Sequence, residues 1–407
     1  MNKRMDSLDF LRGISMILII FFHTSIYNYA NIHKIDFNNP PIIVVVMSFL
    51  VLWGGLIIFY SAMVNTIMLS GRIEKSDNLK HLKLLFMAGG IYLIIHYVLN
   101  IAFGRWNIDF INNQPDMTAV ASSIRNMQLT FPQMTKYFEG SSISTIGLNL
   151  IIVSSLIYFL LRKKGCEKEK RSYQLLAILG FIIMLFSFIR IYIYDITTQS
   201  IESGNYLLAA IFSFTIENPY PLFPYVAYGL FASILGIMIY KKRRNLIKKV
   251  MLPIGLFFFI YGLIGCMNFP KSISQADYFW YFKTHLELGI FILVLIYFVL
   301  TFELGSKTIK NIPCINYFSR ISLTIYLLET PVSEIFGKML NYLMPAWNQT
   351  INGCLSFGAF NVVSWIFVLN IWRKSHFKYS LEYWWVKLFY KVGKESTKMD
   401  FSITPNG

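Results

Sequence analysis

The stretch LDFLRGISMILIIFFHTSIY, residues 8–27, combines a long apolar run with two cationic or titratable side chains, Arg12 and His23. His23 lies eleven positions after Arg12, and at 100° per residue this is about 20° past three full helical turns. They therefore share a helix face, roughly 16 Å apart along the axis. Asp9 lies three residues before Arg12, within reach of an ion pair. Ionisable residues are costly in hydrocarbon, so this pattern marks a functional candidate.

Composition sets the broad class of the protein. Of 407 residues, 55% are hydrophobic and only 14% are charged, and the mean hydropathy is +0.52. Apolar runs near twenty residues recur and match the thickness of a bilayer core. The sequence predicts an all-α, polytopic membrane protein with the lipid bilayer as its environment.

Charge and cysteine content exclude other classes. The net charge of +16 is explained by basic cytoplasmic loops, so no nucleic-acid partner is predicted. The four cysteines show no metal-binding spacing, and we expect free thiols and no bound metal. No cleavable signal peptide is expected, since the first span lacks a small-residue cleavage site.

Ten membrane spans are predicted within a single domain covering residues 1–407. Their expected bounds are 8–29, 41–66, 82–103, 142–161, 174–196, 222–240, 250–268, 282–303, 316–340 and 351–372.

Basic residues alternate between the loops of this arrangement. With the N-terminus in the cytoplasm, inner segments hold 29 Lys and Arg and outer segments hold 7. Such an asymmetry predicts cytoplasmic N- and C-termini.

Three segments outside the spans carry their own signals. The long outer loops 104–141 and 197–221 suit short surface or re-entrant helices, and YLLAAIFSFTI, residues 206–216, is too short to span. The segment 378–391 mixes Trp, Tyr and Lys at helical spacing, which predicts a helix lying in the inner headgroup region.

Titratable residues within the predicted spans gather in one depth layer. Seven are expected in the outer half of the bilayer: His23, His96, Arg190, Asp195, His285, Glu287 and Glu329. Four polar residues are expected near the inner face: Arg12, Tyr60, Ser61 and Arg320. The distribution predicts a polar cavity that opens outward and connects to a cationic inner mouth.

Each of these residues also has a structural interpretation. The histidines and Glu329 can be hydrogen-bonded within the bundle, and Arg190 can pair with Asp195. His285 and Glu287 can be solvated near an interface. Arg320 can be a basic anchor, and Tyr60 and Ser61 can pack between helices.

The opening stretch RMDSLDFLRGISMILIIFFHTS, residues 4–25, closely resembles the transmembrane acyltransferase superfamily, which includes acyltransferase-3 proteins and bacterial relatives of heparan-α-glucosaminide N-acetyltransferase. The matching element is an Arg, ten residues and then a His in the first span. Further similar segments extend the resemblance to residue 385: GGLIIFYSAMVN (54–65), NPYPLFPYVAYGLFASILG (218–236), SRISLTIYLLETP (319–331) and SLEYWW (380–385). One departure is Glu329, which stands where many acyltransferase-3 relatives carry His.

The resemblance implies transfer of an acyl group, usually acetyl from acetyl-CoA, across the membrane to a glycan. Arg12, with Asp9, Tyr60, Ser61 and Arg320, is then expected to bind the phosphate-bearing donor from the cytosol. His23 is expected to act as a general base or to be acylated itself.

Glu329 is expected to orient His23 or to bind acceptor hydroxyls. The acceptor cavity is expected to include His96, Arg190, Asp195, His285 and Glu287. The rival interpretations are a transporter or channel that uses the same polar layer, and a membrane scaffold. Usage rich in Ile, Lys and Asn suggests a bacterial plasma-membrane protein, which can form a homo-oligomer.

Overall fold

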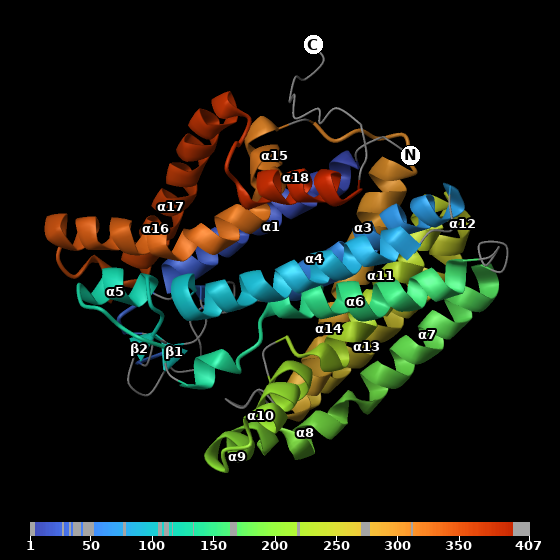
Figure 1. Ribbon diagram of the computed structural model, residues 1–407, viewed down its shortest axis with the longest axis horizontal. Helices are drawn as coiled ribbons and strands as arrows, with labels where there is room; N and C mark the ends of the chain where they lie inside the picture. The colour runs from blue at the N-terminus through green and yellow to red at the C-terminus, as the bar shows by residue number, and fades with distance from the viewer. Residues whose placement is uncertain are drawn as a thin grey trace. The chain divides into compact units, whose positions relative to one another are not determined.

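The chain is built almost wholly from helices (Figure 1). The computed structural model describes residues 5–26, 28–31, 34–35, 42–43, 53–75, 79–104, 108–109, 114–115, 117–132, 134–162, 169–217, 220–269, 277–310 and 312–393. Within these ranges nine helical stretches are long and apolar enough to cross a membrane: Asp6–Ile26, Gly54–Lys75, Leu79–Phe103, Ser142–Leu161, Glu169–Ile193, Leu222–Tyr240, Arg244–Asn268, Tyr278–Glu303 and Ile351–Ser375. The protein is therefore an all-α polytopic membrane protein, as its sequence predicts.

The expected span at 316–340 is not one continuous apolar helix. It consists of α15, Pro313–Arg320, and α16, Ser322–Leu343, with non-helical backbone at Ile321 between them. Its long part, α16, carries Glu329, Glu334 and Lys338, and is too charged to count among the nine apolar stretches. The predicted segment is helical, but it is broken and more polar than its neighbours.

The expected span at 41–66 was wrong in position. The helix α3 covers Trp53–Lys75 and so continues nine residues past the expected end; residues 44–52 lie outside the described part. Asn65 and Thr66, the last two residues of the expected span, lie within α3 and form hydrogen bonds there. Asn65 donates to the Ser61 carbonyl at 2.7 Å, and the Thr66 hydroxyl lies 2.8 Å from that of Ser233.

The observed bounds of α3 change where two candidate residues lie along the helix. Tyr60 and Ser61 lie in the first half of the helix, whereas its basic residues, Arg72 and Lys75, occupy its last turn. Tyr60 and Ser61 therefore precede the first of these basic residues by at least eleven positions, and their expected place near the inner face stays a prediction.

The described residues cluster into two compact units. Unit 1 comprises 1–7, 54–96 and 134–308, and unit 2 comprises 8–53, 97–133 and 309–407. The expectation of a single domain stays a prediction.

Unit 1 contains most of the long helices. They are α3, α4 (Leu79–Val98), α6 (Ser142–Leu161), α7 (Glu169–Phe186), α11 (Leu222–Tyr240), α13 (Leu252–Asn268) and α14 (Tyr278–Phe298). The helices α13 and α14 pack closely: a Cβ at Gly262 would lie 2.2 Å from the Leu286 backbone nitrogen, so the backbones meet where there is no side chain. Small residues at such crossings let membrane helices approach each other.

Short elements complete unit 1. The segment Tyr206–Ile216 forms a short apolar helix, as expected. It consists of α10, Tyr206–Phe212, followed by a π-helical turn at Ser213–Glu217. The remaining pieces are α8 (Arg190–Ile193), α9 (Ile196–Glu202) and α12 (Arg244–Leu246).

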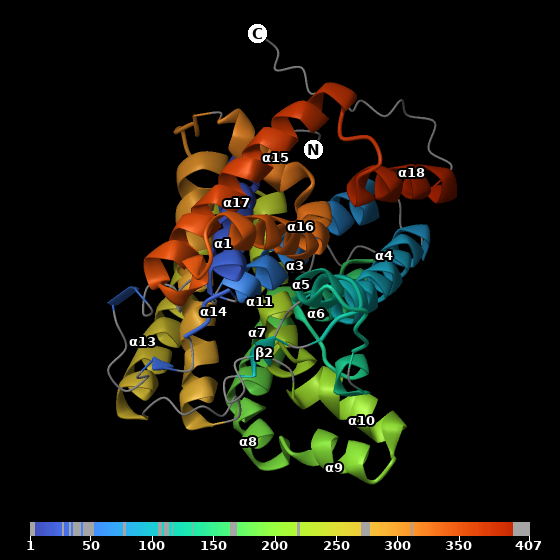
Figure 2. The same cartoon turned by 90° about the vertical axis from the view of Figure 1, so that its left-hand side faces the viewer.

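Unit 2 contains the first helix, α1, Asp6–Ile26, from Leu8 onward. It also contains α5 (Ala121–Asn126), α15, α16, α17 (Ile351–Trp372) and α18 (Leu381–Gly393). Two short strands, β1 (Ile108–Asp109) and β2 (Gln114–Pro115), pair antiparallel with Ile108 opposite Pro115. The helix predicted at 378–391 is present as α18, which meets α16 (Figures 1 and 2).

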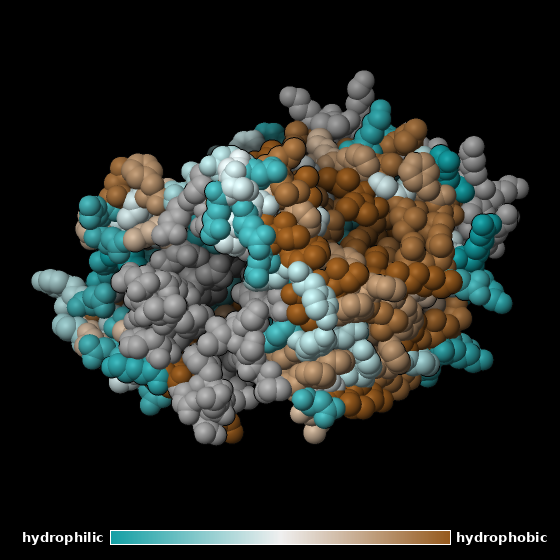
Figure 3. All heavy atoms as spheres, turned by 90° about the horizontal axis from the view of Figure 1, so that it is seen from below, coloured by the Kyte–Doolittle hydropathy of each residue, from teal (hydrophilic) through white to brown (hydrophobic). Residues whose placement is uncertain are grey.

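Many large apolar side chains face outward, as a membrane protein requires. On α13, Phe257, Ile260 and Ile264 are exposed, and on α7 so are Ile178 and Ile182. Figure 3 shows a broad apolar surface of this kind. In lipid such side chains carry no penalty for exposure.

The orientation of the termini is a prediction that cysteine labelling can test. In a variant whose four native cysteines are replaced, Leu129→Cys should react with an impermeant thiol reagent applied outside, because its loop is predicted to be external. Leu129 is 71% exposed, so access is not limited by burial. Asn245→Cys, in the basic segment after α11, should react only after the membrane is opened. The reverse labelling pattern would refute the predicted orientation.

Candidate active site

Arg12 sits in a three-membered polar cluster within unit 2. Its Nη2 lies 3.2 Å from Asp9 Oδ1, and its Nε donates to the Ser319 hydroxyl at 2.9 Å. The Ser319 hydroxyl in turn donates to Asp9 Oδ1 at 3.1 Å. Because three bonds close a ring, the guanidinium is held in one orientation. The predicted Asp9–Arg12 pair is confirmed, and its side chains are 12% and 29% exposed.

The contact between α1 and α15 explains how this cluster forms. A Cβ at Gly13 would lie 2.2 Å from the Ile315 carbonyl oxygen, so only glycine allows the two backbones to come this close. The close approach brings Arg12 next to Ser319, four residues further along α15 than Ile315.

His23 meets Glu329 at the other end of α1. The imidazole Nδ1 makes a hydrogen bond with Glu329 Oε1, which joins α1 to α16. The Tyr326 ring, one turn earlier on α16, lies 6.2 Å from the imidazole centre. The side chain of Glu329 is 2% exposed and that of His23 is 17% exposed, so the carboxylate is enclosed while the imidazole is still accessible.

This arrangement determines what the imidazole can do. When Glu329 is ionised it only accepts hydrogen bonds, so Nδ1 is then the donor. In a neutral ring with its proton on Nδ1, the lone pair is on Nε2. A carboxylate-oriented imidazole of this kind is suited to take a proton from a hydroxyl or to attack an acyl carbon. The second carboxylate oxygen, Oε2, is buried and has no hydrogen-bond partner among the described residues.

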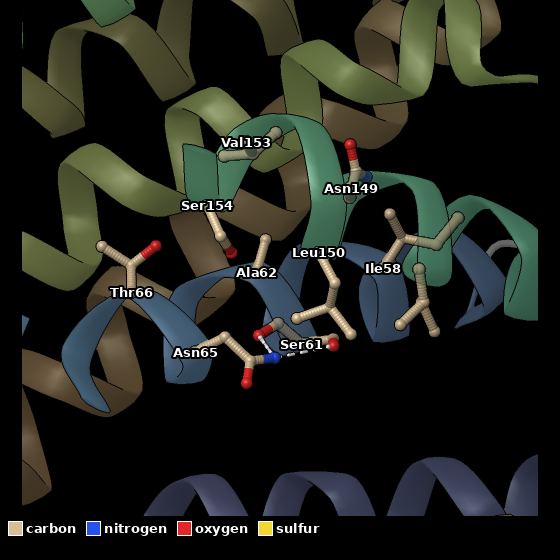
Figure 4. A pocket seen from close by; sticks show the side chains of 10 residues that line it. Ile58, Ser61, Ala62, Asn65, Thr66, Asn149, Leu150, Val153 and Ser154 are labelled. Atoms are coloured by element: carbon tan, nitrogen blue, oxygen red, sulfur yellow. Dashed lines mark hydrogen bonds between the residues drawn. The ribbon is translucent and has the colours of Figure 1, made fainter. Parts of the chain in front are cut away.

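The expected donor residues Tyr60 and Ser61 lie in unit 1. Tyr60 is buried on α3. Ser61 lines a small pocket between α3 and α6, with Asn65, Asn149 and Ser154 supplying most of its other polar groups (Figure 4). Arg320, the remaining member of the expected donor set, is the half-buried last residue of α15 in unit 2, directly after Ser319.

Two of the five expected acceptor residues are charged groups buried in unit 1. Arg190 is fully buried, its guanidinium lies 3.6 Å from the centre of the Trp280 ring, and its Nε donates to the Ile216 carbonyl. Glu287 accepts from the Tyr225 hydroxyl at 3.3 Å and lies 3.5 Å from Lys283 Nζ.

The other three expected acceptor residues have separate neighbours. His96 Nδ1 lies 2.9 Å from the Ser141 hydroxyl. His285 Nδ1 donates to the Tyr281 carbonyl at 2.7 Å, and aromatic rings surround it. Asp195 precedes the first turn of α9. A common acceptor cavity formed by the five residues stays a prediction.

The sequence analysis did not identify three residues of unit 2 that contact the candidate site or the helix that carries it. Ser319 bridges Asp9 and Arg12, Tyr326 flanks His23, and Glu382 of α18 binds the start of α16. Ser319 and Tyr326 lie in the quoted segment SRISLTIYLLETP, and Tyr326 is one turn before Glu329 on the same face, which was the available signal. Nothing in the spacing of Glu382 indicates its partner.

Comparison with known families places this chain. The model of the acyltransferase domain family, acyltransferase-3, matches residues 5–369. This range includes Arg12 and His23 on α1 and the whole of α16. The chain belongs to the acyltransferase-3 family, and it is a membrane acyltransferase. No curated protein matches it.

Proposed function

We propose that the protein transfers an acyl group, acetyl in the simplest case, from cytosolic acyl-CoA to a hydroxyl or amine of an extracytoplasmic glycan. The observation that carries the proposal is the bond between His23 Nδ1 and Glu329, which leaves Nε2 as the basic atom. The family supports acyl transfer. The basic loops and apolar helices support a plasma-membrane location, and the composition supports a bacterial one.

The chemistry can follow two routes from the same pair. In the first, Nε2 takes the proton of the acceptor hydroxyl as its oxygen attacks the thioester carbon. The C–S bond then breaks, and the CoA thiolate takes up the proton from the imidazolium. In the second, Nε2 itself attacks the thioester carbon, and the C–S bond breaks to release the CoA thiolate. The acceptor then attacks the acyl carbon, its proton passes to the thiolate, and the N–C bond to His23 breaks to restore the neutral imidazole. In both, Glu329 stabilises positive charge on the ring.

Arg12 is the proposed donor anchor. A guanidinium forms charge-assisted bonds to phosphate oxygens and is 29% exposed here, so part of it can reach a ligand. Asp9 and Ser319 hold it without enclosing it. If the predicted topology holds, Arg12 lies at the cytoplasmic end of α1, on the side where acyl-CoA is present.

A transfer assay tests the proposal. Purified protein in detergent is given acetyl-CoA with a radiolabelled acetyl group and a mixture of cell-wall sugars. We expect labelled sugar together with free CoA thiol, and no labelled sugar from His23→Gln. Failure of every sugar and amine acceptor to take up label would reject the proposed acceptor class.

The Arg12 substitutions make a separate prediction. Arg12→Ala should weaken acetyl-CoA binding by about tenfold or more, the size expected for losing a charge-assisted contact of about 1.5–3 kcal/mol. Arg12→Lys should recover only part of the affinity, because an ammonium cannot form the two-pronged contact. Isothermal titration of folded protein measures this. Unchanged donor affinity in Arg12→Ala would assign Arg12 to topology alone.

A further inference from the structure

The C-terminal helix α18 contacts the start of α16 through one carboxylate. Glu382 Oε1 accepts from the backbone N–H of Leu323 at 2.6 Å and of Thr324 at 3.2 Å, and Oε2 accepts from the Thr324 hydroxyl. The Leu381 backbone N–H donates back to Thr324 Oγ1 at 2.8 Å. A segment nearly sixty residues away in sequence therefore satisfies N–H groups that the first turn of a helix leaves without partners.

The chemistry of this contact is favourable. A helix N-terminus carries partial positive charge, and a carboxylate beside it forms charge-assisted bonds. Burial raises the pKa of the Glu382 carboxyl, and its bonds to Thr324 and Leu323 oppose that rise.

The contact between Glu382 and α16 lies next to the non-helical backbone that joins α15 to α16. The backbone at Ile321 is non-helical (φ −120°, ψ 37°), with Ser319 and its bond to Arg12 on one side and α16 on the other. Glu329 follows Thr324 by five residues, or about 7.5 Å along the helix. A shift or rotation at the start of α16 would therefore move the carboxylate that orients His23.

The opposite face of α18 points away from this contact. Trp384, Lys387 and Leu388 are exposed, and at 100° per residue they lie about 140–240° around the helix from Glu382. Lys387 Nζ lies 4.9 Å from the centre of the Trp384 ring. Two further exposed lysines, Lys374 and Lys378, precede the helix. Tryptophan and lysine together suit the headgroup region of an anionic bilayer surface.

We propose that α18 couples an anionic lipid surface to the active site: its outer face binds acidic headgroups while Glu382 on its inner face positions α16 and thereby Glu329. Glu382 is a positioning residue, since it acts through α16 and does not touch the reacting atoms. The effect on catalysis rests on the proposed function, whereas the contact with α16 and with lipid does not.

Substitution of Glu382 tests the positioning step. In phosphatidylglycerol-containing bilayers, Glu382→Ala should lower kcat by about tenfold or more, because displacements near 1 Å cost up to about a hundredfold in rate. Acetyl-CoA affinity should change less than about twofold, since Arg12 lies on α1. Glu382→Gln, which retains an acceptor oxygen, should fall between. The control is Glu74→Gln, which removes an exposed carboxylate bonded to Lys241 in unit 1 and should leave kcat unchanged.

Hydrogen exchange provides a readout that does not depend on activity. Exchange at the backbone N–H groups of Leu323 and Thr324 should rise in Glu382→Ala and remain slow in Glu74→Gln. If no acyl transfer is found under any condition but exchange rises, the proposed function fails and the positioning contact stands. Unchanged exchange and unchanged kcat in folded Glu382→Ala would overturn the positioning role.

The lipid step is tested by bilayer composition. Wild-type protein should turn over faster with phosphatidylglycerol than with phosphatidylcholine alone, by about fivefold, the factor that one lysine, Lys387, contributes at an anionic surface. The double variant Trp384→Ala, Lys387→Gln should lose most of this stimulation. Lys248→Gln, an exposed lysine in unit 1, should keep it. Equal stimulation in the double variant and wild type, or no stimulation in wild type, would overturn coupling to the lipid surface.

Discussion

Replacing His23 by alanine or glutamine should abolish acyl transfer while the donor still binds. The proposed reaction needs Nε2 as base or nucleophile, and neither substitute supplies it. General-base catalysis contributes about 10²–10⁴-fold, so we expect kcat to fall by at least about a hundredfold. Glutamine imitates the hydrogen bonding of the imidazole but not its basicity, so it should be nearly as inactive as alanine. Label transfer from acetyl-CoA measures kcat, and titration measures donor affinity.

The control for His23 is folding and donor binding in the same sample. His23 is only partly exposed and bonds to Glu329, so a variant is assessed only if it elutes as a single species and retains donor affinity. Substantial turnover by His23→Gln would refute both the base and the nucleophile routes.

The acyl-histidine route makes one additional prediction. Protein incubated with labelled donor and no acceptor should carry label on His23 that hydroxylamine removes, since an acyl-imidazole is a reactive acyl donor. Label at His23 would establish the nucleophile route, and its absence in an active preparation would favour the base route.

Glu329→Gln is expected to have the second-largest effect. The amide has nearly the same shape, but its NH₂ group can donate to Nδ1 and so favour the ring form with its proton on Nε2. In that form the reactive nitrogen has no lone pair. Removal of the ring's charge partner also destabilises the imidazolium. Loss of the equivalent carboxylate in a serine protease costs about 10⁴-fold, so we expect kcat to fall by about 10²–10⁴-fold with donor affinity retained.

A nearby carboxylate offers a matched control for Glu329. Glu334 lies on the same helix and is also buried, at 4% exposure, so Glu334→Gln imposes a similar change on α16. It should retain most of the wild-type kcat. Equal losses in the two variants would indicate that α16 tolerates no change of this kind, and would remove the support for a specific role of Glu329.

The sequence predicted the parts of the site that depend on one helix. The periodicity of residues 8–27 placed Arg12 and His23 on one face, and the i,i+3 spacing predicted the Asp9–Arg12 pair, both local properties of a helix. The contact of Glu329 with His23 was one of two roles expected for it, and the structure shows this contact.

Features that depend on packing between distant segments were not predictable. Ser319 binds Arg12 only because Gly13 lets α15 approach α1, and the sequence contains no signal for that crossing. The expected end of the second span at residue 66 was wrong, because α3 continues to Lys75 and Asn65 and Thr66 find hydrogen-bond partners within the bundle. Hydropathy cannot distinguish a satisfied polar residue from the end of a span.

Transfer measured across a sealed membrane distinguishes an acyltransferase from a sugar transporter. Sealed vesicles containing the purified protein hold cell-wall sugars inside and receive labelled acetyl-CoA outside only. We expect labelled sugar inside, free CoA thiol outside, and neither product from His23→Gln vesicles. Label that remains wholly on CoA while sugar escapes from wild-type vesicles would contradict acyl transfer across the membrane and would instead support a sugar transporter.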